Sequence, residues 1–107
     1  MISRIITCTI DPEKINEFKS ALNDNFLPRI QTQSGFVDNL ESLDPATGEF
    51  CCMTLWESAA DIKNYDEGLF QEVAASITPL LKDQPMVRTL PVENSSLHNI
   101  KAGSVAA

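Results

Sequence analysis

The chain has 107 residues and a mass of 11.8 kDa, which suits a single domain. Apolar residues make up 43% and charged residues 21%, which excludes a disordered chain, a collagen-like repeat and a disulfide-dense miniprotein. The net charge of −7, from 8 Lys and Arg against 15 Asp and Glu, is repelled by nucleic acid and by anionic membranes. We therefore expect neither as a partner.

The first predicted element is a strand over residues 2–10, which are rich in β-branched side chains. Alternation along it places Ile2, Ile6, Cys8 and Ile10 on one side. No secretory signal precedes this strand, so we expect a cytoplasmic protein.

The next segment predicts an amphipathic helix. Asp11 is a good N-cap and Pro12 a good first helical residue. Apolar side chains then recur every three or four residues and form one stripe: Ile15, Phe18, Leu22, Phe26 and Ile30. Pro28 lies inside this pattern, so the last turn is expected to end or bend there.

A β-hairpin is predicted from strands at 36–43 and 49–56, because the residues between them form a dense turn signal. In the first of these strands, simple alternation places Asn39 with its more polar neighbours. We therefore expect Asn39 to face water or a dimer seam rather than a pocket.

The second half of the chain predicts two short helical stretches and a strand. Ser58 begins a helix that runs to about Asp66, Gly68 interrupts it, and helical spacing then continues to about residue 81. Residues 85–92 form the last strand, whose Pro91 favours a sheet edge. Residues 1–93 are thus one domain, and residues 94–107 are expected to be a flexible tail.

The order β-α-β-β-α-β predicts a ferredoxin-like α+β fold, a four-stranded antiparallel sheet with helices on one face. The strand at 49–56 is apolar on both of its sides, yet two helices cover only one face. The uncovered face is expected to pack against a second copy, giving a homodimer. A monomer covered by its own tail is the competing explanation.

Cysteines and the single histidine offer little for chemistry. Two of the three cysteines are adjacent, which is poor geometry for disulfides, and we expect small apolar side chains at Cys8, Cys51 and Cys52. His98 lies beyond the last strand, and no His, Cys and carboxylate spacing forms a metal site. We therefore expect no metal.

The stretch 50–61 (FCCMTLWESAAD) resembles the strand-then-helix signature of the antibiotic biosynthesis monooxygenase domain, and residues 34–36 and 85–88 are similar to it as well. The resemblance covers about residues 1–93. It implies a dimeric α/β barrel with a pocket in each subunit between the sheet and the helices. It also implies a cofactor-free oxygenase acting on a small phenol or quinol in an apolar pocket.

On this resemblance, Trp56 and Tyr65 are the candidate catalytic residues: the Trp ring as a wall for a flat substrate, the Tyr hydroxyl as a hydrogen-bonding or proton-accepting group. The pocket lining is expected to include Phe18, Cys52 and Phe70. The structural alternatives are a Trp that fills the barrel end and a Tyr whose hydroxyl lies at the surface.

Two further functions stay open. A non-catalytic dimeric module that binds a small apolar ligand needs no polar catalytic set. Haem-degrading relatives use a helix His and a first-strand Asn together with the Trp, and of these only Trp56 is matched here. Polyketide-oxidising relatives place an Asn where this chain has Cys52, and burial makes this thiol a small hydrophobe rather than a nucleophile.

Overall fold

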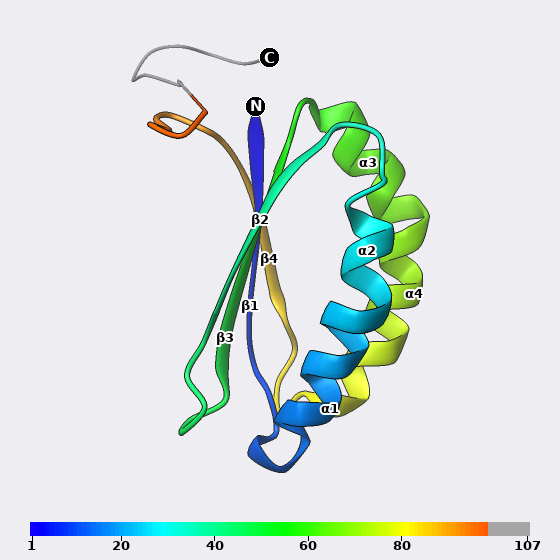
Figure 1. The fold of residues 1–107 in the computed structure, drawn as a ribbon, viewed down its shortest axis with the longest axis vertical. Coiled ribbons are helices and arrows are strands. Elements are labelled where there is room, and N and C mark those ends of the chain that lie inside the picture. The colour runs from blue at the N-terminus through cyan, green and yellow to red at the C-terminus, as the bar shows by residue number, and fades with distance from the viewer. Residues whose placement is uncertain (99–107) are drawn as a thin grey trace.

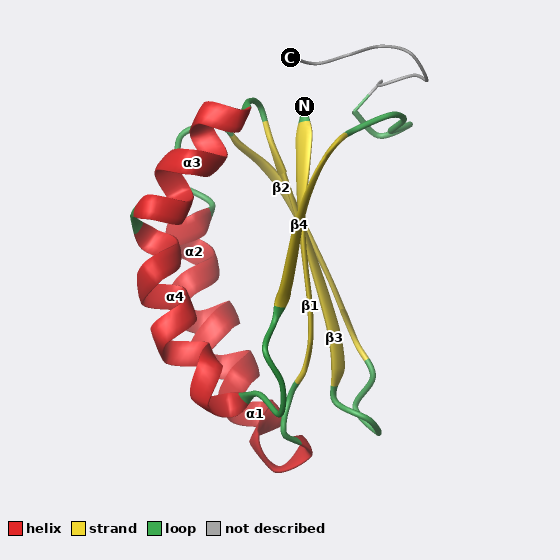
Figure 2. Cartoon of the chain, turned by 180° about the vertical axis from the view of Figure 1, so that it is seen from behind, coloured by secondary structure: helices red, strands yellow, loops and turns green. Residues whose placement is uncertain are grey.

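The computed structural model describes residues 1–98 and contains one four-stranded antiparallel sheet with strand order β2-β3-β1-β4. Its strands are β1 (Ile2–Thr9), β2 (Phe36–Leu43), β3 (Glu49–Trp56) and β4 (Met86–Pro91). All helices lie on one face of this sheet (Figures 1 and 2). The predicted ferredoxin-like α+β fold is confirmed. Of the predicted tail, residues 99–107 lie outside the described part.

The helical segment between β1 and β2, called here the first helical layer, is continuous and consists of four pieces. They are η1 (Pro12–Lys14), α1 (Ile15–Lys19), η2 (Ser20–Phe26) and α2 (Leu27–Ile30). The η2 piece is π-helical, and at its end the Leu27 N–H donates to the Leu22 carbonyl five residues earlier. The helix therefore does not end at Pro28; its winding widens ahead of this residue, which has no N–H to donate.

The second helical layer consists of α3 (Ala59–Glu67), α4 (Leu69–Ile77) and the short η3 (Thr78–Leu80). The Ser58 hydroxyl oxygen accepts from the Asp61 N–H, as a capping residue does. Gly68 separates α3 from α4, as the sequence predicts.

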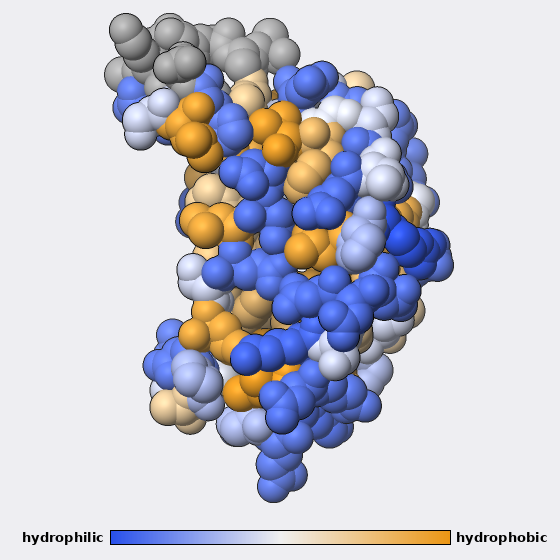
Figure 3. Space-filling model, viewed as in Figure 1, coloured by the Kyte–Doolittle hydropathy of each residue, from blue (hydrophilic) through white to orange (hydrophobic). Residues whose placement is uncertain are grey.

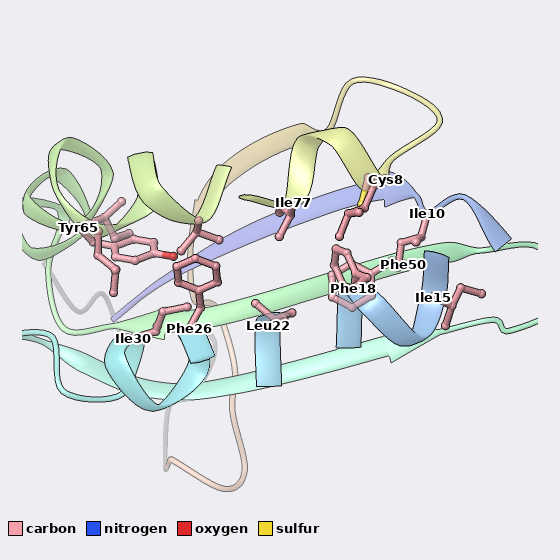
Figure 4. Packing of buried hydrophobic residues seen from close by; sticks show 14 of the residues in the cluster. Cys8, Ile10, Ile15, Phe18, Leu22, Phe26, Ile30, Phe50, Tyr65 and Ile77 are labelled. Carbon is pink, nitrogen blue, oxygen red and sulfur yellow. The ribbon is translucent and has the colours of Figure 1, made fainter. Parts of the chain in front are cut away.

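The hydrophobic core lies between these helices and the inner face of the sheet (Figure 4). The whole predicted stripe on the first helical layer is buried: Ile15, Phe18, Leu22, Phe26 and Ile30. Phe18 meets Phe50 of β3 edge to face, with ring centroids 4.9 Å apart. This contact joins the first helical layer to the sheet.

A β-bulge in β2 changes which side chains face the helices. The register shifts between Phe36 and Asp38, so Val37 is an extra residue in the ladder. Beyond the bulge, Asn39 pairs with Thr54, whose side chain is buried beneath the helices. The prediction that Asn39 faces water or a dimer seam is wrong, because simple alternation does not allow for the extra residue.

The opposite side of the sheet, called here the open face, carries exposed apolar side chains. Leu40 is 64% and Met86 66% exposed. Hydrophobic residues also interrupt the otherwise hydrophilic surface on the sheet side of Figure 3. The described start of the tail reaches β2, where His98 Nε2 lies 3.4 Å from Asp38 Oδ2. This contact leaves Leu40 and Met86 uncovered.

Candidate functional site

A cavity of about 40 Å³ lies between the helices and the inner face of the sheet. Four of the five predicted site residues line it: Phe18, Cys52, Tyr65 and Phe70. Most of the wall is apolar, and polar side chains enter mainly from the strands. The cavity thus combines an apolar lining with a few polar groups, which is the usual composition of a small-molecule site.

Tyr65 is only 4% exposed, and its hydroxyl points along the space between sheet and helices toward Phe26 (Figure 4). Its hydroxyl is therefore not at the surface. Within residues 1–98 no hydrogen bond reaches this hydroxyl. Burial raises the pKa of Tyr65 well above its usual value, although Arg4 acts in the opposite direction. At neutral pH this phenol is protonated and is available to donate a hydrogen bond.

Trp56 is fully buried and stacks on Tyr65, with ring centroids 5.0 Å apart. Its Nε1–H donates to the Thr54 hydroxyl oxygen at 2.8 Å, not to a backbone carbonyl. Trp56 does not line the cavity. It lies one layer behind Tyr65 and holds that ring in place.

A polar row crosses the inner face of the sheet at the cavity. Asn39, Thr54 and Arg4 are paired neighbours on β2, β3 and β1. All three line the cavity, and Thr54 and Arg4 are buried. A row of polar groups this deep in a sheet is costly unless it makes hydrogen bonds or binds something.

A hydrogen-bonded chain occupies the β2 side of the cavity. The Cys52 thiol donates to Asn39 Oδ1 at 3.2 Å, and Asn39 Nδ2 donates to Glu41 Oε2 at 2.8 Å. Burial, reinforced by Glu41, raises the pKa of Cys52 to about 12. The thiol is therefore neutral, which agrees with the prediction that it is not a nucleophile.

The cavity has a neighbouring outer recess of about 170 Å³, lined partly by Lys19, Asn23 and Leu43. Phe18 and Glu41 belong to the walls of both spaces. The recess lies between the first helical layer and β2.

Known proteins are similar to this chain in structure, but no match is found at the level of sequence. No protein-family model matches the sequence, and no curated protein matches it. The structure is similar to a monooxygenase from the gene ActVA-Orf6 of Streptomyces coelicolor in complex with nanaomycin D. The TM-score is 0.75 and the identity 14%, over 88% of each chain.

Two other solved structures are similar to the same extent. SnoaB, a cofactor-independent oxygenase from Streptomyces nogalater, gives a TM-score of 0.73 at 13% identity, over 89% of this chain and 95% of that one. A protein from Nitrosomonas europaea, described as an antibiotic biosynthesis monooxygenase, gives 0.74 at 16% identity, over 88% and 100%. This chain shares the fold of these three proteins. The resemblance in residues 50–61 is therefore matched by the whole architecture.

The strand residues of the cavity were not predicted from the sequence. Arg4 shares its strand side with Ile2, Ile6 and Cys8, so its place among apolar residues was a signal of an inward charge. Asn39 and Glu41 had no such signal, because the bulge turns them inward. Within residues 1–98 no group of three metal-ligating side chains occurs. None of the helices there is long and apolar enough to cross a membrane.

Proposed function

We propose that this protein is a cofactor-independent oxygenase that acts on a small phenol or quinol bound in the cavity. The observation that carries the proposal is the buried Tyr65 hydroxyl, which faces an enclosed apolar cavity and has no hydrogen-bond partner among residues 1–98. A substrate oxygen would receive its hydrogen bond. The proposal also extends to this chain the properties of two structural relatives, one of which binds nanaomycin D while the other is a cofactor-independent oxygenase.

The chemistry needs little from the protein. In an anthrone-like phenol, ionisation makes the ring electron-rich enough to pass electrons to dioxygen. A ring CH₂ then becomes C=O. One oxygen atom enters the product, and the other leaves as water with the two hydrogens. The substrate supplies all four electrons, so no external reductant is required. The protein binds, orients, removes a proton and excludes water.

Each role has a candidate among the cavity residues. Tyr65, protonated at neutral pH, donates to the substrate oxygen. Glu41 lines both the cavity and the outer recess and accepts the phenol proton. Phe18, Cys52 and Phe70 contact the ring, and Trp56 positions Tyr65 by stacking on it.

The size of the cavity sets one condition on this function. About 40 Å³ holds a few water molecules but not an aromatic ring. Binding therefore requires Phe18 and its neighbours on the first helical layer to move, so that the cavity joins the outer recess. The π-helical turn at Ser20–Phe26 lies in this layer, and such turns are frequent at functional sites.

A second candidate is a non-catalytic module that binds a small apolar ligand. The small volume of the closed cavity and the neutral Tyr65 and Cys52 favour it. Under this alternative the same cavity opens for a ligand, but dioxygen is not consumed.

We also propose that the protein is a homodimer formed through the open face. Leu40 and Met86 are exposed there, and the described start of the tail does not cover them. A shallow depression of about 640 Å³ continues this face past Thr7, Ser42 and Cys51. It is wide open, and none of the five predicted site residues lines it, so we assign it to the dimer rather than to the substrate.

The deciding experiment is dioxygen uptake by the metal-free full chain with a panel of hydroquinones and anthrone-like phenols. We expect uptake above the spontaneous rate. Tyr65→Phe keeps the ring stacked on Trp56 but removes the hydroxyl, and we expect it to lower turnover about 10²-fold or more with little loss of binding. Asn64→Ala, on the exposed side of the same helix, serves as the control and should not change the rate.

The outcomes separate the two functions. Uptake that is equal in the wild type and Tyr65→Phe removes Tyr65 from the reaction. Binding without any uptake across the panel favours the ligand-binding module. If no compound of the panel binds and none is consumed, both proposed functions are contradicted.

A further inference from the structure

Arg4 is an unusual residue in this cavity. It is only 3% exposed, in the polar row that crosses the inner face of the sheet. Its guanidinium lies over the Phe70 ring at 4.1 Å from the centroid and over the Tyr65 ring at 5.5 Å. These contacts hold the cation beside the cavity that it lines.

The partners of Arg4 are incomplete. One guanidinium nitrogen lies 2.7 Å from Asp66 Oδ1 of α3. The buried Nε carries no hydrogen bond within the described residues. A buried donor without an acceptor is destabilising, and a cation is more so than a neutral donor. An oxygen anion in the cavity would supply the missing acceptor.

The remaining charges near Arg4 are two carboxylates. Asp66 pairs with it from α3, and Glu41 lines the same cavity from β2. Asn39 donates to Glu41, which offsets part of that negative charge. When a phenol gives its proton to Glu41, the negative charge moves to the phenol oxygen and Glu41 becomes neutral. The charge balance around Arg4 is then preserved.

We propose that Arg4 is the anion-binding residue of this cavity, and that the site takes its phenolic or enolic ligand in the ionised form. The proposal rests on the proposed function, since it names the state in which that site holds its substrate. Guanidinium N–H groups form strong, directional bonds with an anionic oxygen. The two aromatic rings below Arg4 prevent it from moving away from the ligand.

The field of Arg4 on its neighbours agrees with this role. Burial is the main influence on both Tyr65 and Cys52, and it raises the pKa of each. Arg4 lowers both pKa values, so it favours negative charge at two separate points of the cavity wall. At the outer recess, Lys19 places a second cation on the path by which an anion would arrive.

The test uses 4-nitrophenol, whose ionisation is followed by the visible absorbance of its phenolate, with 4-nitroanisole as the probe that cannot ionise. Equilibrium dialysis against the full chain first measures binding of each probe. The absorbance of 4-nitrophenol is then titrated with pH in the presence of excess protein. We expect the pKa of 4-nitrophenol to be lower by about one unit or more when it is bound than when it is free. At pH values above the pKa of the bound phenol, we expect 4-nitroanisole to bind more weakly than 4-nitrophenol.

Four variants assign the shift to Arg4. Arg4→Met keeps a long apolar side chain but no charge, so burial alone should then raise the pKa of the bound phenol. Arg4→Lys should restore most of the downward shift. Glu41→Gln removes an opposing charge and should lower this pKa further. Because Arg4→Met leaves Asp66 Oδ1 buried without its cation, Arg4→Met with Asp66→Asn serves as the variant in which both partners are neutral.

The results that overturn the proposal differ from those that overturn the proposed function. If the pKa of bound 4-nitrophenol rises in the wild type, or falls equally in Arg4→Met, the anion site is wrong and the ligand pocket stands. If neither probe binds at millimolar concentration, the pocket itself is wrong and the anion site falls with it.

Discussion

At the scale of single residues, the cavity is notable for groups that stay protonated. Burial raises the pKa of Cys8 to about 11 and that of Cys52 to about 12, from an ordinary value of 9.0. The pKa of Tyr65 rises above its usual value for the same reason. At neutral pH these side chains therefore contribute hydrogen-bond donors rather than charges. The charged side chains that line the cavity are those of Arg4 and Glu41.

The raised thiol pKa values predict a loss of stability in alkali. Below pH 9 the thiols are protonated in both the folded and the unfolded chain. Between about pH 9 and pH 12 the unfolded chain loses these protons while the folded chain keeps them, so the free energy of unfolding falls as the pH rises. One such thiol contributes a slope of at most about 1.4 kcal/mol per pH unit.

Urea unfolding at a series of pH values from 8 to 10.5 checks this expectation. Cys52→Ala should show a shallower decline than the wild type, whatever its own stability at pH 8. Identical slopes for the two proteins would show that Cys52 is not held neutral by the fold.

At the scale of elements, the turn between β2 and β3 is held against the end of β1. Gly48 has a φ of +82°, and a Cβ there would overlap the carbonyl oxygen of Ile10. The Ile10 N–H in turn donates to the Gly48 carbonyl at 2.8 Å. The hairpin turn and the start of the first helical layer are therefore fastened together at one backbone contact.

Gly48→Ala should destabilise the protein by about 2 kcal/mol, because the positive φ and the overlap with Ile10 both oppose a side chain. Thr47→Ser in the same turn keeps the hydroxyl that accepts from the Glu49 N–H and should change the unfolding free energy by less than about 0.5 kcal/mol. Chemical denaturation of both variants measures the difference. A Gly48→Ala protein as stable as the control would mean that the turn is free to move away from Ile10.

The elements also show what was predictable from the sequence. The hairpin strands were predicted with their observed bounds, because a turn signal and alternation are local properties. The π-helical turn was not predicted. Apolar residues spaced three or four apart are compatible with an α-helix and also with a helix that is locally wound slightly wider. The inward orientation of Asn39 was missed for a related reason: a bulge is decided by pairing with β3, and β2 alone does not reveal it.

At the scale of the whole molecule, the two faces of the sheet differ in what covers them. Its inner face contacts the helices and the cavity. Its open face presents exposed apolar side chains on both edge strands, Leu40 on β2 and Met86 on β4. Every residue of β4 is exposed. A bare apolar sheet face is typical of an association surface. The net charge of −7 opposes association, so apolar contact must supply the attraction.

Leu40→Glu should convert the proposed dimer to a monomer, since it places a charge on the open face. Ala60→Glu changes the net charge equally but lies on the exposed side of α3, and it should leave the dimer intact. Sedimentation velocity of the wild type and both variants distinguishes these states. A wild-type protein that sediments as a monomer at high concentration would contradict the dimer.

The bulge at Val37 decides which residues of β2 face which side of the sheet. Along β2, the residues that line the cavity alternate with those that we propose to contact a second chain. If Val37 paired in the ladder and Phe36 stayed opposite Trp56, Leu40 would lie opposite Cys52 and face inward, and Asn39 would face outward. Deletion of Val37 would instead leave Asn39 opposite Thr54, so a chain one residue shorter at this point would keep the same cavity wall.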